Sequence, residues 1–189
     1  MMRQAGKNMA QLLDEVLLVG RADSGTLQLN LSSLNLETFC ENLLGELEFT
    51  ANKKKIEVIL NAEGEFSDCL WDENLLRHIL GNIIANSIKY SQAGQSVLLE
   101  LIGQPEAVVF RLQDWGMGIP PEDLEYLFEP FRRASNVGNI PGTGLGLAIA
   151  KSCTQTHGGK IEVVSKLGVG TTVTVTIPKI SASTKQKAG

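Results

Sequence analysis

The sequence lacks a framework of cysteines and an excess of positive charge. Its three cysteines, Cys40, Cys69 and Cys153, are odd in number and lie far apart. They have no metal-ligand spacing, which argues against disulfide and zinc sites and favours reduced structural thiols in a cytoplasmic protein. The formal net charge of −4 argues against a general nucleic-acid-binding protein, although a local basic cluster can still bind phosphate.

A long apolar run is also missing. The stretch LLDEVLLVG near the N-terminus is interrupted by Asp14 and Glu15, so it is neither the core of a signal peptide nor a membrane span. We therefore expect no membrane contact from this chain, and a longer membrane-anchored parent stays open. Apolar residues make up 43% of the chain and charged residues 20%, a balance typical of a globular protein.

Hydrophobic periodicity predicts an α+β protein. Apolar residues at helical spacing predict helices at 8–21, 35–54 and 145–159, and within 69–91, where Asp72 is the expected cap. Alternating or β-branched runs predict strands at 27–31, 55–62, 96–103, 107–115, 160–166 and 171–178. Because the strands come in pairs without regular strand–helix–strand alternation, we expect a two-layer sandwich in which helices cover one face of a mixed sheet.

The expected division of the chain lies near Ser24. Residues 1–24 hold the first helix and a linker, and residues 25–180 hold the main domain. Residues 181–189 have no apolar anchor and are expected to form a disordered tail.

Three glycines at alternate positions, Gly142, Gly144 and Gly146, stand at the start of the helix predicted over 145–159. Glycines before a helix let the backbone approach a phosphate. No Gly-Lys-Ser/Thr follows, which excludes a P-loop, and the polar loop that precedes them takes the place of the strand that a dinucleotide fingerprint requires. A phosphate site and a helix that merely starts close to a sheet both remain open.

A second glycine pair follows a carboxylate. Asp114 ends a predicted strand, and Gly116 and Gly118 let the chain turn sharply after it. A carboxylate can accept a hydrogen bond from the exocyclic amino group of adenine, and glycines leave room for the flat base. The alternative is a surface turn that ends at Pro120 and Pro121.

The helix predicted within 69–91 carries a polar stripe. At about 100° per residue, His78, Asn82, Asn86 and Lys89 fall on one narrow face. Amide oxygens suit a metal cation and an ammonium suits a phosphate. The alternative is an ordinary solvated helix face, but two asparagines inside a helix are unfavourable and call for another reason.

Together these stretches resemble the ATP-binding catalytic domain of bacterial sensor histidine kinases, in the GHKL superfamily. LRHILGNIIANSIKYS resembles the N box, DWGMGI the first glycine box and LFEPFRR the F box. GTGLGLAIAK resembles the second glycine box, and GVGTTVTVTIP the final one. The ordered motifs span residues 35–178, which makes the resemblance more specific than any single glycine pattern. It implies the Bergerat-type ATP-binding fold, preceded by a remnant helix of a dimerisation hairpin.

The resemblance implies roles for individual residues. Asn86 matches the Mg²⁺-binding asparagine, Asn82 a second contact to metal and phosphates, and Arg133 a basic residue that reaches the terminal phosphate, with Arg132 less secure. Asp114 matches the carboxylate that binds adenine, and Thr171 or Thr172 lines the base pocket. The implied catalytic set is Asn82, Asn86, Lys89 and Arg133. The implied ATP-binding set is Asn86, Lys89, Tyr90, Asp114, Gly116, Gly118, Ile119, Gly142, Thr143, Gly144, Leu145, Gly146, Leu147 and Thr171.

One departure separates the chain from the ATPases of the superfamily. They carry a glutamate as general base one turn before the metal-binding asparagine, where this chain has Asn82, an amide that cannot accept a proton at neutral pH. The resemblance therefore implies a site that holds ATP·Mg²⁺ without efficiently activating water, and whose acceptor is a histidine on a separate helical hairpin. His78 is interpreted as a helix-face residue and His157 as a helix cap, rather than as acceptors.

The implied function is transfer of the γ-phosphate of ATP to that histidine, for relay to the receiver domain of a response regulator. The implied parent is a cytoplasmic or membrane-anchored homodimer, and this chain is expected to be a monomer or a weak dimer. The alternatives are a GHKL serine kinase, a GHKL ATPase and a nucleotide-binding module without turnover.

Overall fold

The computed structural model describes residues 2–67 and 69–181. The helical elements are α1 (Met2–Asp23), α2 (Leu36–Lys53), α3 (Glu73–Tyr90), α4 (Pro121–Leu124), the 3₁₀ turn η1 (Ser135–Val137) and α5 (Gly146–Thr156). The strands are β1 (Ser32–Ser33), β2 (Glu57–Glu63), β3 (Cys69–Trp71), β4 (Ser96–Gly103), β5 (Ala107–Asp114), β6 (Lys160–Lys166), β7 (Gly170–Pro178) and β8 (Ile180–Ser181).

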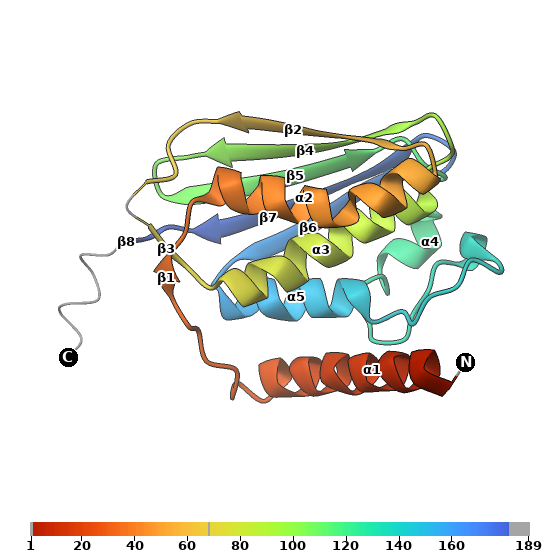
Figure 1. The fold of residues 1–189 in the computed structure, drawn as a ribbon, viewed down its shortest axis with the longest axis horizontal. Helices are drawn as coiled ribbons and strands as arrows, with labels where there is room; N and C mark the ends of the chain where they lie inside the picture. The colour runs from red at the N-terminus through yellow and green to blue at the C-terminus, as the bar shows by residue number, and fades with distance from the viewer. Residues whose placement is uncertain (1, 68, 182–189) are drawn as a thin grey trace.

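A mixed sheet forms one layer of the fold, and its strand order is β2-β4-β5-β7-β6. The pair β2 and β4 is parallel, and the other neighbours are antiparallel. Helices α2, α3 and α5 cover one face of this sheet (Figure 1). The predicted α+β sandwich is therefore confirmed.

Two side chains fix where the central helices begin. The Asn35 side chain accepts a hydrogen bond from the Thr38 amide at 2.9 Å, at the start of α2. Asp72 accepts one from the Leu75 amide at 3.0 Å, at the start of α3, which confirms the predicted cap. From there α3 buries an apolar face at helical spacing: Leu75, Leu76, Ile79, Leu80, Ile83, Ile84 and Ile88.

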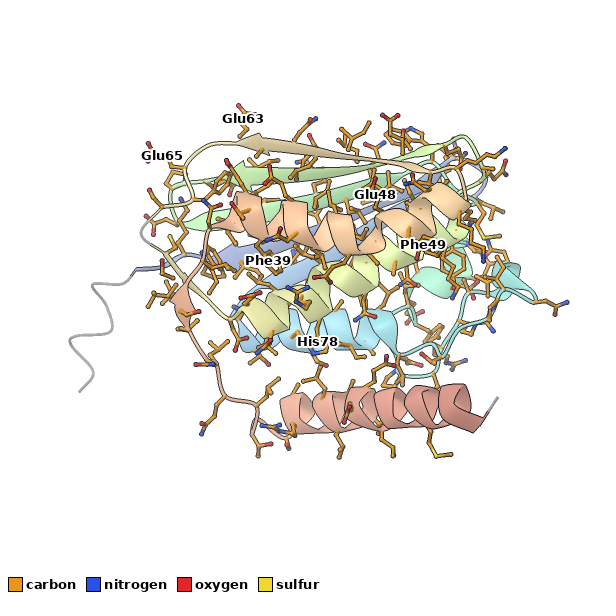
Figure 2. All side chains as sticks on the ribbon, viewed as in Figure 1. Phe39, Glu48, Phe49, Glu63, Glu65 and His78 are labelled. Atoms are coloured by element: carbon orange, nitrogen blue, oxygen red, sulfur yellow. The ribbon has the colours of Figure 1, made fainter. Side chains whose placement is uncertain are left out.

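Helix α2 is amphipathic. Phe39 and Phe49 both belong to α2 (Figure 2), yet Phe39 is 3% exposed and Phe49 is 80% exposed. Ten residues correspond to about 1000° along a helix, so the two rings leave it on different faces. Phe39 belongs to the core between helices and sheet, together with Leu43.

Helix α1 lies alongside α5, outside the sheet-and-helix layers (Figure 1). Val19 is buried, whereas Met9, Leu13 and Leu17 are each more than half exposed. The helix ends at Asp23, next to the division predicted near Ser24. Within residues 2–67 and 69–181, no helix is long and apolar enough to cross a membrane.

A second, small sheet joins β1, β3 and β8. The strand predicted at 27–31 is wrong, because the strand in this region covers Ser32 and Ser33. Leu27 and Leu29 pack against the core, and the Asn30 amide donates to the Asp72 carboxylate at 2.7 Å. The alternation thus marks a partly buried segment without a strand partner. The tail predicted at 181–189 lies, beyond Ser181, outside the described residues.

Candidate functional site

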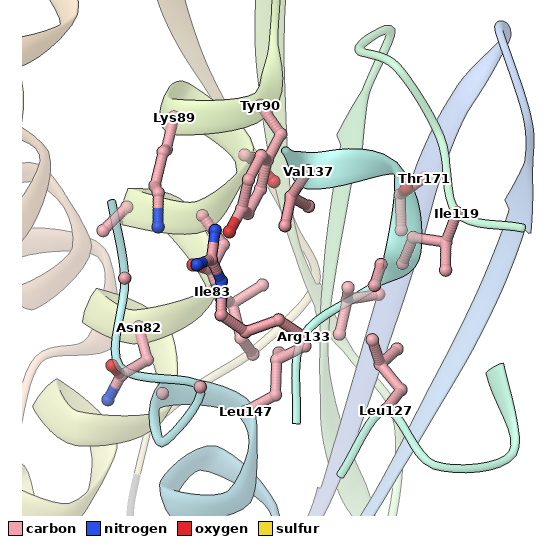
Figure 3. A pocket seen from close by; sticks show the side chains of 18 of the residues that line it. Asn82, Ile83, Lys89, Tyr90, Ile119, Leu127, Arg133, Val137, Leu147 and Thr171 are labelled. Atoms are coloured by element: carbon pink, nitrogen blue, oxygen red, sulfur yellow. The ribbon is translucent and has the colours of Figure 1, made fainter. Parts of the chain in front are cut away.

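A cavity of about 360 Å³ opens between α3, the end of β5, the loop after α4 and the start of α5. All four residues of the expected catalytic set line it, as do most of the expected ATP-binding residues (Figure 3). The lining residues that sequence analysis predicted are Asn82, Asn86, Lys89, Tyr90, Asp114, Gly118, Ile119, Arg132, Arg133, Gly142, Thr143, Gly144, Gly146, Leu147 and Thr171. Gly116, Leu145 and Thr172 do not line the cavity.

One end of the cavity is built around Asp114, which is only 7% exposed. Its carboxylate accepts hydrogen bonds from the Ser87 hydroxyl at 3.0 Å, the Gly116 amide at 3.0 Å and the Thr171 amide at 3.2 Å. Burial raises the pKa of Asp114, and these three donors oppose that rise. A carboxylate has about four acceptor positions, so three donors leave one for a ligand.

Other backbone segments pass so close to Gly116 and Gly118, the glycines beside Asp114, that a side chain there would clash with them. Gly118 has φ +66°, and a Cβ on it would lie 2.1 Å from the Lys166 carbonyl oxygen. A Cβ on Gly116 would lie 2.6 Å from the Tyr90 carbonyl oxygen. The turn therefore packs against α3 and the β6–β7 hairpin, which argues against a plain surface turn.

The other end of the cavity is built from long polar side chains. Lys89, Tyr90 and Arg133 point into the same space, the first two from α3 and the third from the loop (Figure 3). The Lys89 ammonium lies 4.8 Å from the centre of the Tyr90 ring. A Cβ on Gly142 would lie 2.5 Å from the Lys89 Nζ, so the loop passes close to this ammonium. The Arg133 guanidinium donates to the Ile140 carbonyl. Two cations thus face one space, which suits a polyphosphate.

Asn82 and Asn86 both line the cavity from α3. The Asn82 amide nitrogen donates to the His78 carbonyl at 2.7 Å, and its oxygen would lie 2.8 Å from a Cβ on Gly146. The start of α5 therefore lies directly against the Asn82 side chain. Among the described residues, no group of three or more His, Cys, Asp or Glu side chains could hold a metal ion. Mg²⁺ bound through one or two protein oxygens and substrate phosphates fits such an amide-lined site.

The loop from Arg132 to Gly144 is anchored at its base. The Asp123 carboxylate accepts from the amide and the hydroxyl of Ser135, both at 2.7 Å, and these bonds lower its pKa. The Asn136 side chain donates to the Gly118 carbonyl at 2.8 Å. Helix α5 then begins without a side-chain cap, and an uncapped helix start has amide groups available to a phosphate.

The two histidines have different environments. His78 is exposed on α3. His157 stands at the C-terminal cap position of α5, as expected for a helix cap. It is buried, and its Nε2 accepts from the Asp72 amide at 3.2 Å, so it links the end of α5 to the start of α3. Burial lowers the pKa of His157.

Sequence analysis missed several lining residues. Ser87 and Val173 belong to predicted elements, but only the position of α3 and the register of β5 with β7 bring them to the cavity. Glu15 lines the cavity from α1, a contact between residues far apart in the sequence. No local sequence pattern marks such residues.

Comparisons with known proteins agree with the resemblance to sensor histidine kinases that the sequence motifs indicate. Residues 71–181 match the family model of histidine kinase-, DNA gyrase B- and HSP90-like ATPases. The chain is 33% identical over 91% of its length to the sensor histidine kinase WalK of Bacillus subtilis, and 31% identical over 92% to the sensor protein kinase PmrB of Pseudomonas aeruginosa. It spans only 29% and 36% of these relatives.

A solved structure agrees. The crystal structure of full-length ShkA in complex with AMPPNP superposes with a TM-score of 0.83 and 28% identity, over 95% of this chain and 38% of that one. The chain therefore belongs to the histidine kinase-, DNA gyrase B- and HSP90-like ATPase family and carries the ATP-binding catalytic domain of sensor histidine kinases.

Proposed function

We propose that this domain binds ATP·Mg²⁺ and transfers the γ-phosphate to a histidine on a helical hairpin. The observation that carries the proposal is the division of one cavity into two ends. A carboxylate with a free acceptor position lies at one end, and two cations lie at the other. The carboxylate can accept from the amino group of adenine, and the cations can bind the phosphates.

Asn86 would hold the metal, with Asn82 as a second contact. Mg²⁺ held there would neutralise charge on the transferring phosphoryl group. Lys89 and Arg133 would stabilise the same charge from two sides. The uncapped start of α5 adds amide donors near Gly146.

Neither histidine of this chain is proposed as the acceptor of the γ-phosphate. Its histidines are His78, exposed on α3, and His157, buried and bonded to the Asp72 amide. The proposal therefore assigns the acceptor to a hairpin of a homodimeric kinase, and the final transfer to the receiver domain of a response regulator. Because the reaction consumes ATP, we assign it to the cytoplasm.

A second candidate function is ATP hydrolysis, favoured by the position of Glu15. Helix α3 supplies amides and a lysine but no carboxylate to the cavity, whereas Glu15 lines it from α1. A carboxylate there could act as a base for water. Replacement by Glu15→Gln separates the candidates: the kinase proposal expects unchanged, slow hydrolysis, and a loss of hydrolysis would favour the ATPase.

The direct test mixes the chain with radiolabelled ATP·Mg²⁺ and a separately made hairpin that carries the acceptor histidine of the same parent. We expect label on the hairpin and none on a hairpin in which that histidine is replaced by glutamine. Asp114→Asn should abolish the labelling. A wild-type chain that binds ATP yet leaves the hairpin unlabelled would contradict the proposal.

A further inference from the structure

The last turn of α3 carries Lys89 and Tyr90 into the cavity, so the way this turn ends matters to the site. The final four carbonyls of a helix have no partner within it and must be satisfied from outside. Two of them are satisfied by the backbone: the Ser91 amide donates to the Ser87 carbonyl at 3.1 Å, and the Met117 amide to the Tyr90 carbonyl at 3.3 Å. The Ile88 and Lys89 carbonyls remain.

Lys54 satisfies both remaining carbonyls. Its ammonium donates to the Ile88 carbonyl at 3.0 Å and to the Lys89 carbonyl, and also to the Ser91 carbonyl at 2.7 Å. The C-terminal end of a helix is negative, so a cation there is stabilising. Burial lowers the pKa of Lys54, and three carbonyl acceptors oppose that loss of hydration.

The backbone of Lys54 is itself held in place. The Ile56 amide donates to the Ala51 carbonyl at 2.9 Å, and the Lys55 amide to the Asn52 carbonyl at 3.0 Å. This is the Schellman arrangement, and its expected apolar contact is supplied by Ile56 and Ala51, which are both buried. The ammonium of Lys54 is therefore delivered from a fixed turn at the end of α2.

We infer that Lys54 is a positioning residue: its ammonium closes the end of α3 and so fixes Lys89 and Tyr90 at the phosphate end of the cavity. The inference rests on the proposed nucleotide site. Asp114 takes one hydrogen bond from Ser87 in this last turn, but its other two donors, Gly116 and Thr171, lie outside α3. Loss of Lys54 should therefore weaken binding of the phosphates more than binding of adenine.

The test is calorimetric titration of the whole chain with ATP·Mg²⁺ and, separately, with AMP. The variants are Lys54→Met and Lys54→Arg, with Lys54→Gln as a milder change if the methionine variant fails to fold. Lys53→Met is the matched control, because Lys53 is the exposed neighbour. Val108→Ala is the stability control, because it truncates a buried side chain at the other end of β5 from Asp114.

We expect Lys54→Met to weaken ATP binding about tenfold, with AMP affinity changing less than about twofold. Lys54→Arg should retain ATP affinity, and Lys53→Met and Val108→Ala should leave the ATP-to-AMP affinity ratio unchanged. If neither Lys54→Met nor Lys54→Gln changes the ATP-to-AMP affinity ratio, the inference about Lys54 is overturned and the proposed function still stands. Failure of the wild-type chain to bind ATP would overturn the proposed function and the inference together.

Discussion

The two ends of the cavity are built in different ways. The Asp114 end is held by short side chains and backbone amides at 3.0–3.2 Å, in a turn where two glycines touch backbone carbonyls. The Lys89 end relies on long side chains from α3 and from the loop between Arg132 and Gly144. A base fits a flat slot with fixed hydrogen-bonding groups, whereas charged phosphate oxygens are bound by long cationic side chains that can reach them. The difference fits the proposal that one end binds the base and the other holds the phosphate that is transferred.

The largest expected effect comes from breaking the rigid end. In Gly118→Ala, a Cβ would lie 2.1 Å from the Lys166 carbonyl oxygen, on a residue with φ +66°. We expect a loss of about 2–4 kcal/mol in the free energy of unfolding, from strain and displaced backbone. Thermal and denaturant unfolding measure it.

The matched control is Gly138→Ala in the loop. Gly138 also has a positive φ, +49°, but a Cβ on it would meet nothing within 4 Å. Because its ψ of −127° lies outside the left-handed helical region, alanine there should cost about 1–3 kcal/mol from the backbone conformation alone, less than Gly118→Ala, which adds a clash with backbone. Equal losses in the two variants would mean that the Asp114 turn is not the more tightly packed of the two regions.

A smaller expected effect is the pH dependence of stability that Asp114 causes at its end of the cavity. Because burial raises the pKa of Asp114 above 3.8, its folded form holds a proton more tightly than its unfolded form. The stability this contributes is fully present below about pH 4 and is lost as the pH rises through the raised pKa. Wild type should therefore lose stability relative to Asp114→Asn over that window. A stability difference that is constant from pH 3 to 7 would show that Asp114 is not desolvated.

Much of the fold followed from local patterns. The apolar spacing of α3 and the alternation in β6 and β7 each decide which face is buried, so the helix and the strands could be predicted without tertiary information. The two-residue strands β1 and β8 could not, because they are too short to carry a pattern. The alternation at 27–31 was misleading because a loop that packs one side against the core can also alternate.

In the candidate site, too, some residues could be predicted from local sequence patterns and others could not. Gly118 permits a sharp turn that other residues adopt only at a cost, and Asn86 is unfavourable inside a helix, so both could be recognised in the sequence. Ser87, Lys54 and Glu15 are ordinary residues in ordinary positions. Their contacts with Asp114, with the end of α3 and with the cavity depend on packing between distant segments, which no local pattern encodes.

The most direct test of the two-ended site is titration of Asp114→Asn and Lys89→Met with ATP·Mg²⁺ and with AMP. Asp114→Asn should weaken binding of both ligands by about a hundredfold, because it replaces the carboxylate that accepts from their common adenine amino group with a neutral amide, whose NH2 group is itself a donor. Lys89→Met should weaken ATP about tenfold and leave AMP nearly unchanged. If both variants lowered the two affinities in the same proportion, the cavity would not be divided into a base end and a phosphate end, and the account would be wrong.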